Sequence, residues 1–79
     1  MTLSIGELRP GEKAVIRSVV GGLGIVRRLE ALGLRPGKNL TKVSSQFLGG
    51  PITIIVDGRY VALGRGIAAR VMVEREKPS

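Results

Sequence analysis

The side chains that most often carry out chemistry in proteins are few in this chain and widely spaced. Its 79 residues include neither cysteine nor histidine, so thiol and imidazole catalysis, disulfides and the two best transition-metal ligands are excluded. A general acid–base pair or a hard-cation site needs carboxyl oxygens that converge, and no local spacing here holds two of them together. The sequence therefore predicts no catalytic residue, no metal ligand and no cofactor. The scattered carboxylates are Glu7, Glu12, Glu30, Asp57, Glu74 and Glu76.

A glycine-rich segment, Gly21-Gly22-Leu23-Gly24, stands ahead of an amphipathic stretch and invites comparison with phosphate-binding loops. Free backbone N–H groups at a helix start can hold a phosphate. The spacing matches neither the P-loop nor the dinucleotide fingerprint, and no Gly-Lys-Ser/Thr follows. A flexible turn is therefore the favoured interpretation.

The chain is basic, with 13 Lys and Arg against 6 Asp and Glu and a net charge of +7. Such a balance is typical of proteins that meet phosphates, anionic lipid headgroups or an acidic protein face. The basic residues are spread from Arg9 to Lys77 in ones and twos, which favours a solvated surface over a dedicated polyanion site.

Two short segments are candidates for binding a partner. Arg27 and Arg28 are expected in the first half of a short helix, where the helix dipole disfavours cations, and this placement indicates an acidic partner. The alternative is a solvated helix face with Glu30 as a neighbour. Phe47 and Leu48 are expected on a loop, where they either anchor a partner or fold down to close one end of the core.

No segment is long enough to cross a membrane as a helix. The longest uncharged stretch, Val43–Val56, contains Ser, Gln, Gly and Pro and falls short of the ~20 apolar residues required. Met1–Ser4 lacks the basic start and apolar core of a signal peptide, so a cytoplasmic protein is expected. One domain over residues 1–75 is expected, with a flexible tail at 76–79.

The tetrapeptide Leu-Arg-Pro-Gly occurs twice, at Leu8–Gly11 and Leu34–Gly37. Proline followed by glycine predicts a type II turn in both copies, each starting a strand. The first strand is expected over Lys13–Val20, with Ala14, Ile16 and Val20 on one face; the second is expected over Asn39–Ser44 and to be shorter. Between them Ile25, Leu29 and Leu32 predict a short helix that ends at Gly33.

The second half of the chain predicts a hairpin and a closing strand. Ile52–Val56 is the strongest strand, Asp57-Gly58 is a two-residue hairpin turn and Arg59–Leu63 returns from it. One helical turn over Ile67–Ala69 and a strand over Arg70–Glu74, with Val71 and Val73 facing inward, complete the chain. Five short strands and one helix indicate a mainly β fold, a small closed or half-closed barrel.

The order of these pieces resembles the FeoA family, ferrous iron transport protein A. The resemblance implies an SH3-like five-stranded barrel with one short α-helix inserted after the first long strand. It also implies a cytosolic accessory of the membrane ferrous iron transporter FeoB, which binds the cytoplasmic region of that transporter, modulates uptake and is neither an enzyme nor an iron carrier. The matching segments are Leu8–Glu12, Arg27–Gly37, Gly49–Val56, Val61–Leu63 and Ala68–Glu74.

Two corners of the chain depart from the family pattern. Gly49-Gly50-Pro51 stands where Gly-Asp-Pro is frequent, and Leu63-Gly64-Arg65-Gly66 replaces Leu-Arg in the last turn. Both corners gain a glycine, which loosens loops that could contact a partner. Weak self-association through exposed apolar loops is also expected. The expected partner-binding residues are Arg27, Arg28, Phe47, Leu48 and Arg65.

Two other functions stay open. The basic charge fits a small β-barrel that binds nucleic acid, although such proteins stack bases on aromatic side chains and this chain has one Phe and one Tyr. Domains related to the FeoA family also occur as regulatory modules of metal-dependent repressors. A stand-alone regulatory domain of that kind is the second alternative, because the chain starts with Met at the domain and no helix-turn-helix segment is seen.

Overall fold

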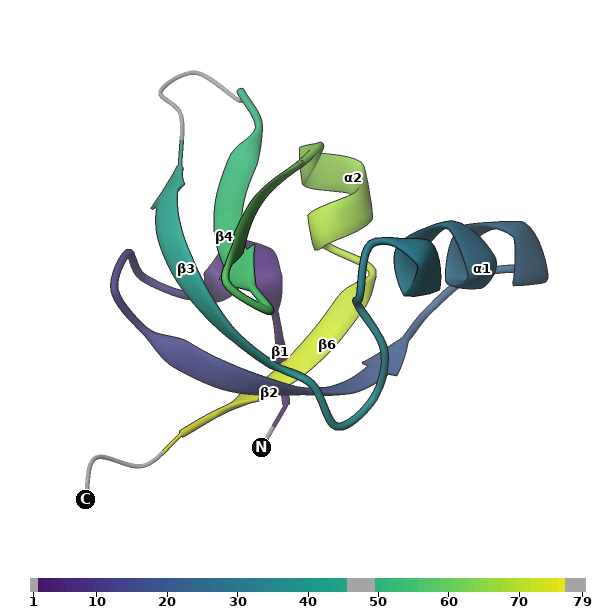
Figure 1. Cartoon of the computed structure of the whole chain (residues 1–79), viewed down its shortest axis with the longest axis horizontal. Helices are drawn as coiled ribbons and strands as arrows, with labels where there is room; N and C mark the ends of the chain where they lie inside the picture. Colours follow the sequence, from purple (N-terminus) through teal and green to yellow (C-terminus); the bar gives the residue numbers. More distant parts are fainter. Residues whose placement is uncertain (1, 46–49, 77–79) are drawn as a thin grey trace.

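The computed structural model describes residues 2–45 and 50–76 (Figure 1). In these residues the fold is mainly β, with one helix of nine residues and two single helical turns. In chain order the elements are β1 (Leu3–Ser4), the 3-10 helix η1 (Ile5–Glu7), β2 (Lys13–Val19), α1 (Leu23–Ala31), β3 (Asn39–Ser45), β4 (Ile52–Val56), β5 (Arg59–Leu63), α2 (Arg65–Ala68) and β6 (Val71–Arg75).

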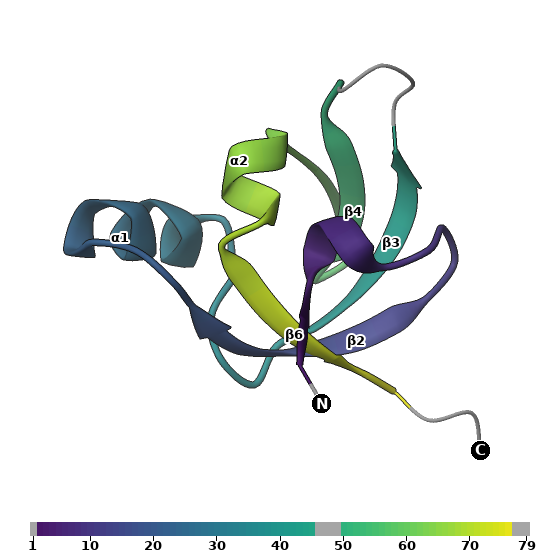
Figure 2. The same cartoon turned by 180° about the vertical axis from the view of Figure 1, so that it is seen from behind.

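The strands form one antiparallel sheet in the order β1-β6-β2-β3-β4-β5. The sheet is strongly bent, and α1 projects from the side of the molecule (Figures 1 and 2). The predicted SH3-like, mainly β fold is confirmed. The described sheet has one strand more than the five predicted. The additional strand is the two-residue β1, which the sequence pattern left unassigned and in which Leu3 pairs with Val73 of β6.

The core lies inside the bent sheet and follows the alternation of the strands. In β4, Ile52, Ile54 and Val56 are buried, and in β6 Val71 and Val73 are buried as predicted. Burial of these side chains is the main source of stability in a domain of this size. The predicted helical turn near Ala68 is present as α2, and the last strand begins one residue later than expected.

Both Leu-Arg-Pro-Gly tetrapeptides form the predicted type II turn. Gly11 and Gly37 have positive φ angles of 90° and 94°, which glycine adopts without steric cost. In each copy the residue after the glycine donates its N–H to the arginine carbonyl, at 3.0 Å in the first and 3.1 Å in the second. The arginines themselves are exposed.

A local two-fold relationship connects the two turns. The Gly11 N–H donates to the Lys42 carbonyl of β3 at 2.7 Å, and the Gly37 N–H donates to the Ile16 carbonyl of β2 at 2.8 Å. Gly37 follows Gly11 in the sequence by the same number of residues as Lys42 follows Ile16. Each turn therefore ends in a bulge with glycine in the left-handed conformation, where two residues oppose one on the facing strand.

The two-fold relationship continues through both strands. Ala14 and Leu40 pair with each other at its centre. Beyond them β2 shifts register against β6 at Arg17, and β3 shifts against β4 at the equivalent Val43. Both strands have seven residues, so the expectation that the second is shorter is wrong.

The bulge at Arg17 changes which side chains of β2 face the core. Ala14 and Ile16 are buried as predicted. One extra residue reverses the alternation beyond the bulge, so Val19 packs against the core and Val20 is 55% exposed. The predicted inward position of Val20 is therefore wrong.

Helix α1 ends as the sequence predicts. Gly33 has a φ of +89°, its N–H donates to the Glu30 carbonyl at 2.9 Å, and the Leu34 N–H donates to the Leu29 carbonyl at 2.9 Å. This is a Schellman motif, and the buried Leu29 and Leu34 supply its apolar contact.

The β4–β5 hairpin fixes the end of α1. Asp57 and Gly58 have φ angles of 52° and 73°, as a two-residue type I′ turn requires. The Asp57 carboxylate accepts a hydrogen bond from the Lys38 ammonium at 2.9 Å, and the Arg59 guanidinium donates to the Leu32 carbonyl at 3.2 Å. These contacts join the hairpin to the C-terminal end of α1 and the turn that follows.

Candidate partner-binding surface

Helix α1 carries apolar side chains on two adjoining sides. Ile25, Leu29 and Leu32 form the predicted stripe and pack in or against the core. The helix begins at Leu23, earlier than this stripe, and Leu23 and Val26 lie one turn apart on the neighbouring side. Leu23 is 63% exposed and Val26 is half-buried, so the apolar surface of the helix extends beyond the core.

A groove lies between α1, the end of β2 and the second Leu-Arg-Pro-Gly turn. Its volume is about 330 Å³ and most of its lining is aliphatic. Val20 follows the lining residue Val19 in the chain, Leu23 lies one helical turn before the lining residue Val26, and both side chains are more than half exposed. We name it the α1 groove, and its lining residues are Arg17, Ser18, Val19, Val26, Glu30, Leu34 and Pro36.

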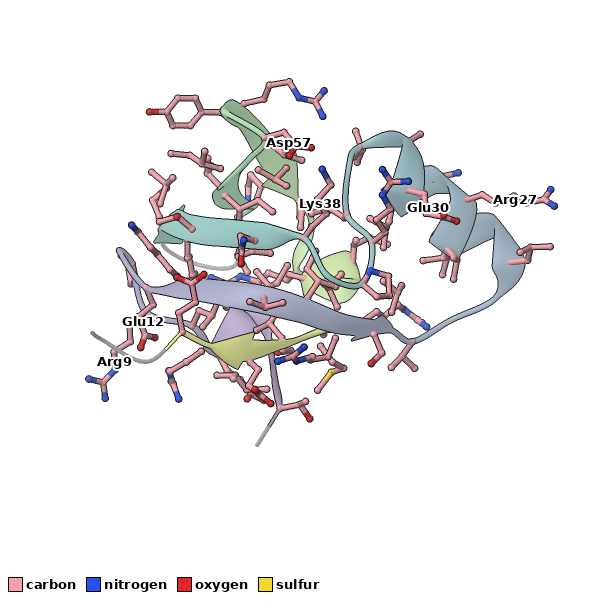
Figure 3. The ribbon with its side chains drawn as sticks, turned by 60° about the horizontal axis from the view of Figure 1, so that its bottom comes forward. Arg9, Glu12, Arg27, Glu30, Lys38 and Asp57 are labelled. Carbon is pink, nitrogen blue, oxygen red and sulfur yellow. The ribbon has the colours of Figure 1, made fainter. Side chains whose placement is uncertain are left out.

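Arginines adjoin lining residues of this groove along the chain: Arg27 follows Val26, and Arg35 lies between Leu34 and Pro36. Arg27 is exposed and extends from α1 away from the sheet (Figure 3), and Arg28 and Arg35 are exposed as well. Across residues 2–45 and 50–76, none of these three side chains makes an ion pair or a hydrogen bond. Arg17 differs, because its guanidinium pairs with the Glu74 carboxylate at 3.1 Å.

Arg27 and Arg28 lie later in the helix than the sequence predicted. The helix spans Leu23–Ala31, so Arg27 is its middle residue and Arg28 lies in its last turn. A cation in the last turn is favoured by the helix dipole. The two arginines are therefore placed on the predicted helix, but their position does not itself indicate an acidic partner.

The other predicted partner-binding residues belong to different parts of the chain. Arg65 is the exposed first residue of α2, a separate element from α1. Phe47 and Leu48 lie outside the described residues. The role of all five residues stays a prediction. The aliphatic lining of the groove was missed, because it combines residues of β2, α1 and the turn after α1 that are separated along the sequence.

Lys42 is a buried cation that the sequence pattern did not single out. Its side chain is 2% exposed, and its ammonium donates to the carbonyl oxygens of Ile5 at 3.3 Å, Gly6 at 3.2 Å and Leu8 at 2.5 Å. Burial lowers the pKa of Lys42, and the charge of Arg65 lowers it further. All three donors are used within the fold, so Lys42 holds η1 against β3 and is not available to a ligand.

Two carboxylates are occupied by internal contacts. Glu12 accepts hydrogen bonds from the Arg9 backbone N–H at 2.6 Å and from Arg75 Nε at 2.8 Å, and these contacts hold its pKa below the ordinary value. The hydrogen bond from Lys38 likewise lowers the pKa of Asp57, whose side chain points toward it in Figure 3. Both carboxylates stabilise turns.

Neither a metal centre nor a membrane span is found in the part of the chain that the structure describes. Within residues 2–45 and 50–76 no group of three or more acidic side chains is placed to hold a metal ion. No helix in these residues is long and apolar enough to cross a membrane. A second cavity of about 300 Å³, lined by Lys13, Asn39, Leu40, Thr41, Ile55, Asp57 and Glu76, carries charges of both signs.

Comparison with known proteins identifies the relatives of this chain. The FeoA domain model matches residues 1–75. A curated protein of Methanocaldococcus jannaschii, named Fe(2+) transport protein A, is 33% identical over 66 residues, which make up 84% of this chain and 78% of that protein.

Solved structures share the fold along nearly the whole chain. The crystal structure of an iron uptake regulatory protein (FeoA) has a TM-score of 0.90 and 36% identity, covering 96% of this chain and all of that one. The FeoA protein of Chlorobium tepidum has a TM-score of 0.84 and 30% identity, covering 92% of this chain and 70% of that one.

A manganese-dependent transcriptional repressor shares the fold, with a TM-score of 0.86 and 17% identity over 95% of this chain and 42% of the repressor. The match over residues 1–75 and the similarity to these relatives show that the chain belongs to the FeoA family.

Proposed function

We propose that this protein is a non-enzymatic accessory of ferrous iron uptake that binds the cytoplasmic region of the membrane transporter FeoB and modulates transport. Membership of the FeoA family supports a role in iron transport. The names of its relatives, an Fe(2+) transport protein A and an iron uptake regulatory protein, support the same role. In this proposal the protein works in the cytoplasm and its partner recruits it to the inner face of the membrane.

The α1 groove is the observation that carries the binding part of this proposal. An aliphatic hollow with exposed apolar and cationic side chains nearby is typical of a surface that another protein covers. Val19 and Val26 supply the apolar lining with the exposed Leu23 one helical turn away, and Arg27 and Arg35 supply the charge. The carboxylates Glu12 and Asp57 are held in structural contacts, which fits a binding protein better than an enzyme.

A titration tests the proposal. The purified cytoplasmic domain of the FeoB transporter from the same organism is added to this protein at low salt, and calorimetry or fluorescence anisotropy follows binding. Saturable binding with one defined stoichiometry is expected. An unrelated acidic protein of similar net charge is the control, because a +7 protein binds polyanions non-specifically. Absence of binding at low salt, or equal binding to the control, would overturn the proposal.

A further inference from the structure

We propose that the α1 groove is the docking site for one acidic, amphipathic segment of the transporter's cytoplasmic region. This inference rests on the proposed function and specifies the surface and the chemistry of the partner. Apolar side chains of the segment enter the groove between Val19, Val26 and Leu34. Its carboxylates face Arg27 and Arg35.

The fold leaves apolar side chains exposed near the groove. Three large hydrophobic residues are well exposed among those described: Val20, Leu23 and Tyr60. Val20 directly follows β2 and the lining residue Val19, and Leu23 begins α1, one helical turn before the lining residue Val26. A bulge at Arg17 turns Val20 outward although its neighbour Val19 packs inward. This exposed apolar surface is thus built into the backbone.

The charge of the groove determines which partner fits. Among the described residues the lining contains one carboxylate, Glu30 of α1, which makes no ion pair. Arg17 is paired with Glu74, whereas Arg27 and Arg35 make no ion pair or hydrogen bond within the described parts of the chain, although the charge of Arg35 helps to lower the pKa of Asp57. The border is therefore net positive, and an acidic segment gains attraction that a basic or neutral one does not.

The same charge argues against a second copy of this chain as the occupant. Each copy carries +7, and a symmetric contact through this surface would bring the unpaired arginines of both copies together. Like charges that face one another across an interface cost several kcal/mol. Self-association through the groove is therefore an outcome that would contradict the inference.

The apolar contact is tested with Leu23→Ser, and Tyr60→Ser serves as the matched control. Both residues are large, apolar and exposed, at 63% and 72%, but Tyr60 lies in β5 and does not line the groove. Leu23→Ser is expected to raise the dissociation constant for the transporter domain about tenfold. Tyr60→Ser is expected to change it less than about twofold. Thermal unfolding of each variant confirms that it is folded before binding is measured.

The charge contact is tested with Arg35→Gln, and Arg9→Gln is its control. The local two-fold relationship places these arginines in equivalent turns with the same backbone hydrogen bonds. Only Arg35 adjoins groove residues, Leu34 and Pro36. Arg35→Gln is expected to weaken binding about three- to tenfold and to reduce its salt dependence. Arg9→Gln should leave both unchanged. Equal effects of the two variants would show that only the net charge matters and would overturn the inference.

The outcomes separate this inference from the proposed function. If the wild-type protein binds the transporter domain and Leu23→Ser binds equally well, the groove is not the docking site although the proposed function stands. If the wild-type protein does not bind that domain, the proposed function fails. The groove is then tested alone with a synthetic helical peptide that carries leucines on one face and glutamates on the other.

With this peptide, amide shift changes in ¹⁵N-labelled protein are expected at Val20, Leu23, Val26 and Arg27, and they should be lost when lysines replace the glutamates. Changes confined to other elements would overturn the inference. Concentration-dependent dimerisation that Leu23→Ser abolishes would assign the groove to a second copy and would overturn it as well.

Discussion

Ile16 and Lys42 occupy equivalent positions in the two halves of a local two-fold relationship. The Ile16 carbonyl accepts the Gly37 N–H, and the Ile16 N–H donates to the Lys38 carbonyl at 2.9 Å. The Lys42 carbonyl accepts the Gly11 N–H, and the Lys42 N–H donates to the Glu12 carbonyl, also at 2.9 Å. Their side chains differ completely: Ile16 fills the core, whereas the buried Lys42 ends on three backbone carbonyls of the η1 segment. The same backbone arrangement thus places a core side chain, Ile16, in one half, and in the other half it places Lys42, which binds the N-terminal η1 segment.

Lys42→Met is therefore expected to destabilise the protein, although it replaces a buried charge with an apolar side chain. The three carbonyl groups would lose their donor while staying inside the fold, and buried acceptors without a partner are costly. We expect a loss of about 2–4 kcal/mol in the free energy of unfolding, measured by urea denaturation. Lys13→Met, at an exposed position of the neighbouring strand, is the control and should change it by less than about 0.5 kcal/mol. A loss for Lys42→Met as small as that of the control would show that the three hydrogen bonds contribute little.

Acid sensitivity is expected to depend on Glu12. The pKa of Glu12 is lowered in the folded state by the Arg9 backbone N–H, with Arg75 contributing further, so its contacts stabilise the fold above the ordinary value of 4.5 and are lost as the pH falls below it. The wild-type melting temperature should therefore drop more between about pH 6 and about pH 3 than that of Glu12→Gln. Thermal unfolding across this range measures the difference. Equal drops in the two proteins would contradict the expectation.

Local patterns were enough to predict most of the fold. Proline followed by glycine predicted both type II turns, Asp57-Gly58 predicted the hairpin turn, and Gly33 predicted the end of α1. Each of these features requires a residue that tolerates a particular φ angle. The alternation in β4 and β6 likewise predicted their buried faces. These features depend on a few neighbouring residues, so the sequence alone carries them.

What could not be predicted depends on contacts between distant strands. The bulge at Arg17 exists only against β6, and it decides that Val20 points outward. The anchoring role of Lys42 depends on η1, which is distant in sequence, so a period-two pattern shows only an isolated lysine in a strand. The α1 groove combines residues of β2, α1 and the turn after α1, which are separated along the sequence, and it was missed for the same reason.

Two glycines of the α1 region should respond to alanine in opposite directions. Gly33 has a positive φ, and an added Cβ would lie 3.1 Å from an Asp57 carboxylate oxygen, so Gly33→Ala is expected to cost about 1–2 kcal/mol. Gly24 lies within the helix with open space around it, and Gly24→Ala should stabilise by about 0.5–1 kcal/mol. Urea denaturation of both variants measures the two effects. Destabilisation by Gly24→Ala would mean that the first turn of α1 is not helical in solution.

The division of α1 into a core side and a groove side predicts a sharp contrast between two leucines. Leu29 is 1% exposed, so Leu29→Ala should lower the free energy of unfolding by about 2–5 kcal/mol through lost burial and the cavity left behind. Leu23 is 63% exposed, so Leu23→Ser should change it by less than about 0.5 kcal/mol. Denaturant titrations of both variants, at equal protein concentration, give the comparison. A loss above about 1 kcal/mol for Leu23→Ser would place that side chain in the core of the protein in solution, and the groove would then lose the apolar residue on which its binding role depends.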